Sequence, residues 1–247
     1  MTRWKASFIH LLISFMVVGS IAAYIIIFWY PPALMRMAKA DKLLMLVGGI
    51  DLIIGPMLTL LVFRQGKPTL RMDLTVIALL QAGFMAFGLY SAFVSRPVFM
   101  VASPRIFDLV FAPDIDPELL AKGKEPQFRT LGVTRPLLVG AMTPTNAGES
   151  RELMDSISSG RGDLQYMPQF YVDYRQVALK LLQHARPLKA ENGVSEQSAA
   201  LLQAAARNYG RQPDELRFMP LRSSRGFAVM LLDGKTGEVV GPADVDP

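Results

Sequence analysis

An aspartate stands in the middle of an apolar run, GGIDLIIGPMLTLLVF, which covers residues 48–63. Asp51 is the ninth residue of the candidate membrane span 43–63, so flanking residues cannot easily carry it to the surface. An ionised carboxylate at mid-span costs about 2.5 to 3.5 kcal/mol, and such residues normally face protein or water. Asp51 is therefore a candidate functional residue. The alternative is a hydrogen-bonded residue that only ties helices together.

Small residues surround this acid on one helical face. Gly48, Asp51, Gly55 and Thr59 recur at intervals of three or four residues, which places them on one side of a helix with little side-chain bulk. Pro56 has no N–H and crowds the carbonyl four residues earlier, which frees a backbone acceptor next to Asp51. The pattern predicts close helix approach, either by a second protein's helix or by the first and third spans of this chain.

Three side chains in the other spans are candidate partners for Asp51. With the N-terminus inside, Asp51 lies about 12 Å below the outer end of its span and Tyr24 about 9 Å below the end of its own, at roughly 1.5 Å per residue. Tyr24 is therefore the expected donor. Gln81 lies nearer the opposite face and His10 lies close to the cytoplasmic boundary, so both rank below Tyr24.

Familiar catalytic arrangements are missing from the sequence. An intramembrane aspartyl protease needs two neighbouring carboxylates, and Asp73 does not match Asp51 in depth. The chain has no cysteine, and no metal-ligand spacing surrounds His184. No glycine-rich phosphate loop or nucleophile elbow occurs. We therefore expect a protein that is not an enzyme, with no catalytic residue, metal or cofactor.

The elements that position these residues fall into two regions. Residues 1–95 contain three apolar runs, about 8–30, 43–63 and 74–94, each long enough to span a bilayer. Residues 96–247 predict an exported α+β domain with an antiparallel sheet. Its expected strands lie within 97–111, 135–142, 216–221 and 227–232, and its expected helices are 149–158, 173–185 and 195–209. The predicted fold class is an α+β membrane protein.

Charge separates the two regions as well. Residues 1–94 hold eight Lys and Arg against three Asp, whereas residues 95–247 hold eighteen of each sign. A neutral domain has no phosphate-binding footprint, so nucleic acid is not an expected partner. Basic residues near the span ends number five on each side and leave the orientation undecided.

Several stretches together resemble the TfpX/TfpZ family of type IV pilin accessory proteins over essentially the whole chain. They are residues 3–5 (RWK), 10–14 (HLLIS), 29–31 (WYP), 51–59 (DLIIGPMLT), 73–81 (DLTVIALLQ), 96–98 (RPV), 107–110 (FDLV), 112–116 (APDID), 170–174 (FYVDY) and 232–246 (LDGKTGEVVGPADVD). The resemblance implies a bacterial inner-membrane protein with a cytoplasmic N-terminus and a periplasmic C-terminal domain. It implies no catalytic residue.

The resemblance also implies a partner, a cognate type IV pilin, major or minor, in addition to the lipid bilayer. We therefore expect a chaperone-like factor that binds or stabilises its pilin and promotes pilus assembly. On this hypothesis Asp51, Gly48, Gly55, Pro56, Thr59, Tyr24 and Gln81 are helix-packing or pilin-contact residues. Two alternatives stay open, a small membrane-anchored pilin-modifying enzyme and a membrane-anchored periplasmic ligand sensor.

Overall fold

The computed structural model describes residues 2–160, 162–189 and 194–245. Contacts divide the chain into two compact units. One contains Met1–Trp29 and Lys39–Ser95, and the other contains Tyr30–Ala38 and Arg96–Pro247. The short segment between the first two spans thus belongs to the same unit as the C-terminal domain.

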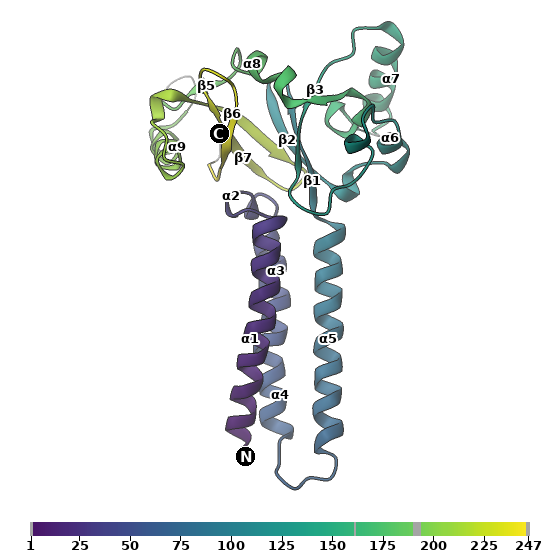
Figure 1. Cartoon of the computed structure of the whole chain (residues 1–247), viewed down its shortest axis with the longest axis vertical. Coiled ribbons are helices and arrows are strands. Elements are labelled where there is room, and N and C mark those ends of the chain that lie inside the picture. Colours follow the sequence, from purple (N-terminus) through teal and green to yellow (C-terminus); the bar gives the residue numbers. More distant parts are fainter. Residues whose placement is uncertain (1, 161, 190–193, 246–247) are drawn as a thin grey trace. The chain divides into compact units, whose positions relative to one another are not determined.

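The first unit consists of long apolar helices (Figure 1). Its elements are α1 (Arg3–Phe28), α3 (Ala40–Gly49), the π-helix η1 (Ile50–Ile54), α4 (Gly55–Val62) and α5 (Leu70–Val94). By length and composition, Arg3–Phe28, Ala40–Val62 and Leu70–Val94 are long and apolar enough to cross a membrane. Side chains on their outer faces, such as Phe15, Leu79 and Phe87, are at least 64% exposed. Helices that are apolar all round are typical of membrane spans.

The middle span, formed by α3, η1 and α4, holds the other two spans together. α1 packs chiefly against η1 and α4, and α5 packs against α3, η1 and α4. The two outer spans therefore share one neighbour. This arrangement determines which faces of α1 and α5 are available to a further helix.

The second unit is built on a mixed sheet with helices around it (Figure 1). Its strands are β1 (Pro97–Ser103), β2 (Ile106–Phe111), β3 (Leu137–Ala141), β4 (Tyr171–Asp173), β5 (Arg186–Pro187), β6 (Leu216–Ser223), β7 (Phe227–Asp233) and β8 (Val239–Ala243). Their order is β4-β3-β1-β2-β6-β7-β8, with β5 also paired to β6. The prediction of three apolar spans followed by an α+β domain is confirmed.

The sheet is mixed and not purely antiparallel as expected. Within the described residues, β1 pairs with β3 and β2 pairs with β6 in parallel, whereas the remaining pairings are antiparallel. Parallel neighbours require long crossover connections, and the sequence between β2 and β6 supplies one of about a hundred residues. The strand pattern in the sequence identifies individual strands, but it does not show which distant strands become neighbours in the sheet.

The helices of this unit are short. They are α2 (Pro32–Met35), α6 (Pro117–Ala121), α7 (Ala147–Ser158), α8 (Ala178–Leu181) and α9 (Glu196–Asn208), with 3₁₀ turns at Ala112–Asp114, Pro126–Phe128, Leu164–Tyr166, Pro168–Phe170, Tyr174–Gln176 and Pro213–Glu215. The expected helix over 173–185 is wrong apart from α8. Asp173 ends β4 and its carboxylate accepts from the Arg175 N–H, which starts a 3₁₀ turn instead.

Two apolar clusters form the core of the domain. One joins β1 and β3 to α7 and the 164–171 segment, and it includes Phe99, Val139 and Tyr171. The other joins β6, β7 and β8 to α9 through Leu202 and Phe218. All seven residues of β1 are buried, which explains its uninterrupted apolar sequence.

Residues 30–38, here called the span-linking segment, pack into this same unit. Leu34, Met37 and Ala38 are buried, and α2 lies against β8. Arg36 forms an ion pair with Asp244, with 3.2 Å between Nη1 and Oδ2. The span-linking segment therefore packs as part of the C-terminal domain.

Candidate functional site

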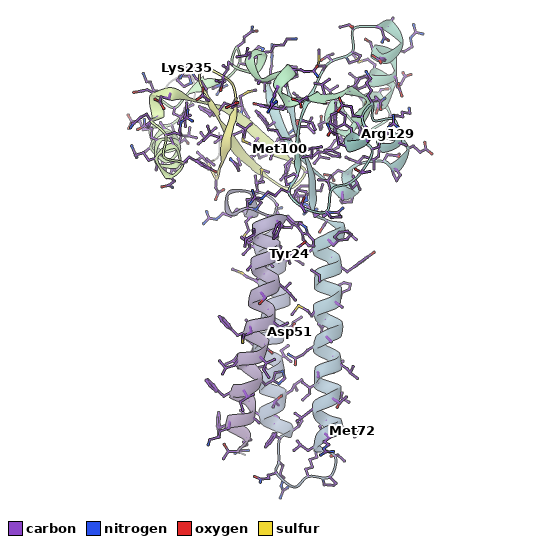
Figure 2. All side chains as sticks on the ribbon, viewed as in Figure 1. Tyr24, Asp51, Met72, Met100, Arg129 and Lys235 are labelled. Carbon is purple, nitrogen blue, oxygen red and sulfur yellow. The ribbon has the colours of Figure 1, made fainter. Side chains whose placement is uncertain are left out.

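Asp51 lies on the π-helix in the middle of the second span. It is the twelfth of the 23 residues from Ala40 to Val62, and it is only 3% exposed. Figure 2 shows Asp51 about midway along the helices, with Tyr24 nearer the end of α1. Single-turn π-helices inside longer helices are frequent at functional sites. The structure therefore gives Asp51 an unusual backbone as well as an unusual depth.

Proline explains why the backbone around Asp51 needs an outside donor. In a π-helix each carbonyl accepts from the N–H five residues ahead, which for Asp51 is Pro56, and proline has no N–H. The amide Nε2 of Gln81 on α5 donates to the Asp51 main-chain oxygen at 3.1 Å instead. The third span thus satisfies the carbonyl that the helix itself leaves unpaired.

A histidine extends this contact into a network across all three spans. His10 Nε2 lies 2.7 Å from Gln81 Oε1, and His10 Nδ1 lies 2.6 Å from Thr59 Oγ1. The Gln81 amide donates through Nε2 to the Asp51 carbonyl, so its Oε1 accepts, and His10 Nε2 carries the proton. In a neutral ring Nδ1 then accepts from the Thr59 hydroxyl. Ser7 Oγ also donates to the Pro56 carbonyl at 2.8 Å.

The small face of the middle span packs against the chain's own helices. A Cβ atom added to Gly55 would overlap the Gln81 amide, and one added to Gly48 would lie 3.5 Å from Val18 Cγ1. Thr59 is 3% exposed. The sequence left open whether this face contacts a second protein's helix or the chain's own helices. In the structure it contacts the first and third spans.

Tyr24 does not reach Asp51 in the way its depth suggested. Its side chain is 45% exposed, and its ring packs against Phe28 and Trp29 at centroid distances of 4.8 and 5.7 Å. Gln81 and His10 form the network instead. The long glutamine side chain crosses the space that Gly55 leaves open, which a count of depth along straight helices does not capture.

The faces of α1 and α5 that point toward each other line a groove. The α1–α5 groove has a volume of about 440 Å³ and Asp51 at its floor. Its other lining residues are His10, Ile13, Ser14, Val17 and Val18 of α1, and Ala78, Gln81, Ala82, Met85 and Ala86 of α5. A second hollow of about 690 Å³ continues past Ala86 to Trp29 and Phe93. The groove lining is apolar except for His10, Ser14, Asp51 and Gln81.

The carboxyl group of Asp51 is the unusual feature of this groove. Both of its oxygens are buried, and neither has a hydrogen-bond partner among the described residues. The nearby Gln81 amide donates to the main-chain carbonyl of Asp51. A buried polar group without a partner costs about 1 to 3 kcal/mol.

The C-terminal domain contains an ion pair between a buried aspartate and a partly exposed arginine, which the sequence did not reveal. Asp108 on β2 is 4% exposed, and its Oδ1 accepts from Arg222 Nε on β6 at 2.8 Å. Burial raises the pKa of Asp108, and the Arg222 hydrogen bond opposes this rise. The two residues are register partners in parallel strands. Only knowledge of that pairing could have found them.

A separate hollow of about 360 Å³ lies in the same domain, at the ends of β1 and β3. It is lined by residues that include Thr143, Lys180 and His184. His184 is exposed and follows α8 instead of lying within a longer helix. No group of three or more His, Asp or Glu side chains that could hold a metal occurs within residues 2–160, 162–189 and 194–245.

Comparison with known proteins connects the chain to fimbrial assembly. The profile described as Fimbrial assembly protein FimB matches residues 1–34. Two Dichelobacter nodosus proteins, named fimbrial assembly protein of serogroup E1 and of serogroup I, are each 27% identical over 98% of this chain and 95% of their own length. The protein of serogroups C1 and C2 is 32% identical over 39% of this chain and 76% of its own length. No solved structure matches the chain significantly.

Proposed function

Because this chain belongs to the fimbrial assembly protein family, we propose that it is a non-catalytic assembly factor that holds a pilin subunit in the membrane. Family membership supports the role in pilus or fimbrial assembly. The α1–α5 groove is the observation that carries the finer statement, because its small residues allow close approach of one further helix. We also propose that the pilus is of type IV and that the chain is a member of the TfpX/TfpZ group, as its sequence resemblance suggests.

The proposed location is the bacterial inner membrane, with the N-terminus cytoplasmic and the C-terminal domain periplasmic. Three apolar helices support membrane anchoring. The packing of the span-linking segment with the C-terminal domain supports an N-terminus on the opposite side of the membrane, because three spans lead from one to the other. The assignment of the N-terminal side as cytoplasmic rests on the resemblance to the TfpX/TfpZ family.

Two contacts acting together make such a factor effective. We propose that the groove binds the membrane-spanning helix of the pilin while the C-terminal domain contacts its exported head. Linking two modest contacts makes the second one intramolecular, and overall affinity then exceeds either alone by about 10²- to 10⁴-fold. A reaction centre is not needed for this role.

A ligand sensor is the second candidate, and one observation favours it. The hollow near His184 has a volume of about 360 Å³. That volume is within the range of small-molecule sites, roughly 300 to 1,000 Å³. Under this alternative the purified full-length chain binds a small molecule in the absence of any pilin, and variants of Lys180 or His184 abolish the binding.

Co-purification of the pilin tests the assembly proposal. The full-length chain with Ala82→Trp fills the groove, whereas Leu80→Trp adds the same bulk on a side chain that is 53% exposed and outside the groove lining. We expect Ala82→Trp to reduce co-purified pilin and surface fimbriae at least about tenfold, or 1.4 kcal/mol, and Leu80→Trp to leave both unchanged. Normal fimbriae in cells that lack this chain would contradict the proposal.

A further inference from the structure

The floor of the α1–α5 groove sets a chemical requirement on the helix that enters it. Asp51 lines the groove and is only 3% exposed. Neither of its carboxyl oxygens has a hydrogen-bond partner among the described residues. Buried polar groups in proteins are normally hydrogen-bonded. The partner of this carboxyl group is therefore to be sought outside the described bundle.

The neighbouring polar groups are already engaged. Gln81 uses one N–H of its amide nitrogen for the Asp51 carbonyl and Oε1 for His10, and the other ring nitrogen of His10 faces Thr59. Ser14 lines the same groove without a hydrogen bond to the carboxyl oxygens in the described structure. Among the described residues, none forms a hydrogen bond to either carboxyl oxygen of Asp51.

The length of the groove favours a helix as its occupant. Ala78, Ala82 and Ala86 line one wall at intervals of four residues, and the second hollow extends this wall to Phe93. From Ala78 to Phe93 the wall measures about 22 Å at roughly 1.5 Å per residue. That is most of a hydrocarbon core of about 30 Å. A lipid acyl chain fits such a groove in shape but carries no donor at the depth of Asp51.

We infer that the groove binds one membrane-spanning helix of the pilin subunit, and that this helix donates a hydrogen bond to the Asp51 carboxyl group from a hydroxyl, amide or amine side chain. This inference rests on the proposed function and adds the chemistry of its partner. Small residues beside the donor let the two backbones approach closely along the alanine wall. The carboxyl group then selects helices that carry a donor at mid-span over helices that are apolar throughout.

Substitutions at Asp51 test the inference in the full-length chain co-expressed with the pilin. A photoreactive residue at Ala82 reports the occupant, and mass spectrometry identifies what it captures. Asp51→Leu removes the acceptor and is expected to lower the pilin crosslink about tenfold, whereas Asp51→Asn keeps an acceptor oxygen and most of the crosslink. Thr75→Val on α5 is the control, because Thr75 is exposed and lies outside the groove lining, and it is expected to change little.

Changes on the pilin keep the test valid if Asp51→Leu fails to fold. Polar residues in the captured helix are replaced by alanine one at a time, alone and together with Asp51→Asn. One of them is expected to lower the crosslink, with no further loss in the double variant. The inference is overturned if Ala82 captures only lipid or a second copy of this chain, or if Asp51→Leu folds and crosslinks normally. The proposed function fails separately, if no pilin co-purifies with the unaltered chain.

Discussion

Gln81 on the third span occupies the space that a Cβ atom on Gly55 of the second span would need. From that position its amide nitrogen donates to the Asp51 carbonyl and its amide oxygen faces His10. One glycine therefore makes room for the side chain that joins all three spans. The arrangement gives the bundle a polar centre that also lines the groove.

Gly55→Ala is expected to displace Gln81 and to destabilise the bundle. Forcing extra atoms into a packed site typically costs about 1 to 3 kcal/mol. Thermal unfolding of the purified full-length protein in detergent measures the loss. Gly83→Ala on α5 is the matched control, because a Cβ there meets nothing within 4 Å. Equal melting temperatures for the two variants would show that Gln81 does not need the space at Gly55.

His10 and Thr59 are expected to be energetically coupled. Their contact joins the first and second spans, and hydrogen bonds between membrane helices contribute on average about 0.6 kcal/mol, with values up to about 1.7 kcal/mol. A double-mutant cycle with His10→Ala and Thr59→Val, followed by unfolding in detergent, gives the coupling energy. Strictly additive losses would mean that this contact contributes nothing.

Gly226 is expected to hold the span-linking segment against the C-terminal domain. A Cβ atom on Gly226 would lie 3.0 Å from the Met37 carbonyl oxygen, so Gly226→Val pushes that segment away. We expect faster trypsin cleavage after Arg36 in the full-length variant than in the unaltered chain. Gly132→Val serves as the control, since a Cβ at Gly132 meets nothing within 4 Å. Unchanged cleavage in Gly226→Val would contradict the packing of residues 30–38.

Asp233 is expected to make the protein sensitive to acid. Its carboxylate accepts from the N–H groups of Thr236 and Lys235, each at 2.9 Å, and these bonds lower its pKa from 3.8 to about 2. A carboxyl group whose pKa is lowered by folding stabilises the protein above its unfolded pKa, and this contribution is lost as the pH falls from about 4 to about 2. Asp233→Asn does not titrate, so the melting temperature of that variant should fall less steeply in this range. Parallel melting curves would refute this contribution.

The sequence predicted well whatever depends on local pattern. The three spans follow from uninterrupted apolar length, and β1 and β2 follow from the strand pattern within residues 97–111. α7 and α9 begin after Asn146 and Ser195, whose side chains cap them. Local chemistry decides these elements, and it is visible in the sequence.

The contacts between distant segments could not be predicted in the same way. The sequence identified Asp51 and the small face around it, but it favoured Tyr24 over Gln81, because depth alone does not show where a long side chain crosses between helices. The parallel pairing of β2 with β6, and with it the Asp108–Arg222 ion pair, depends on a long crossover. The sequence likewise did not show which faces of the two outer spans, α1 and α5, would line a groove together.

Cysteine crosslinking tests the central claim most directly, because the chain has no cysteine of its own. A single cysteine replaces Ala82 in the groove or Leu80 outside it, and single cysteines are scanned through the membrane helix of the co-expressed pilin. We predict disulfides from Ala82→Cys with reactive pilin positions repeating every three or four residues, and none from Leu80→Cys. Equal reactivity at both positions, or none at either, would contradict binding of a pilin helix in the α1–α5 groove.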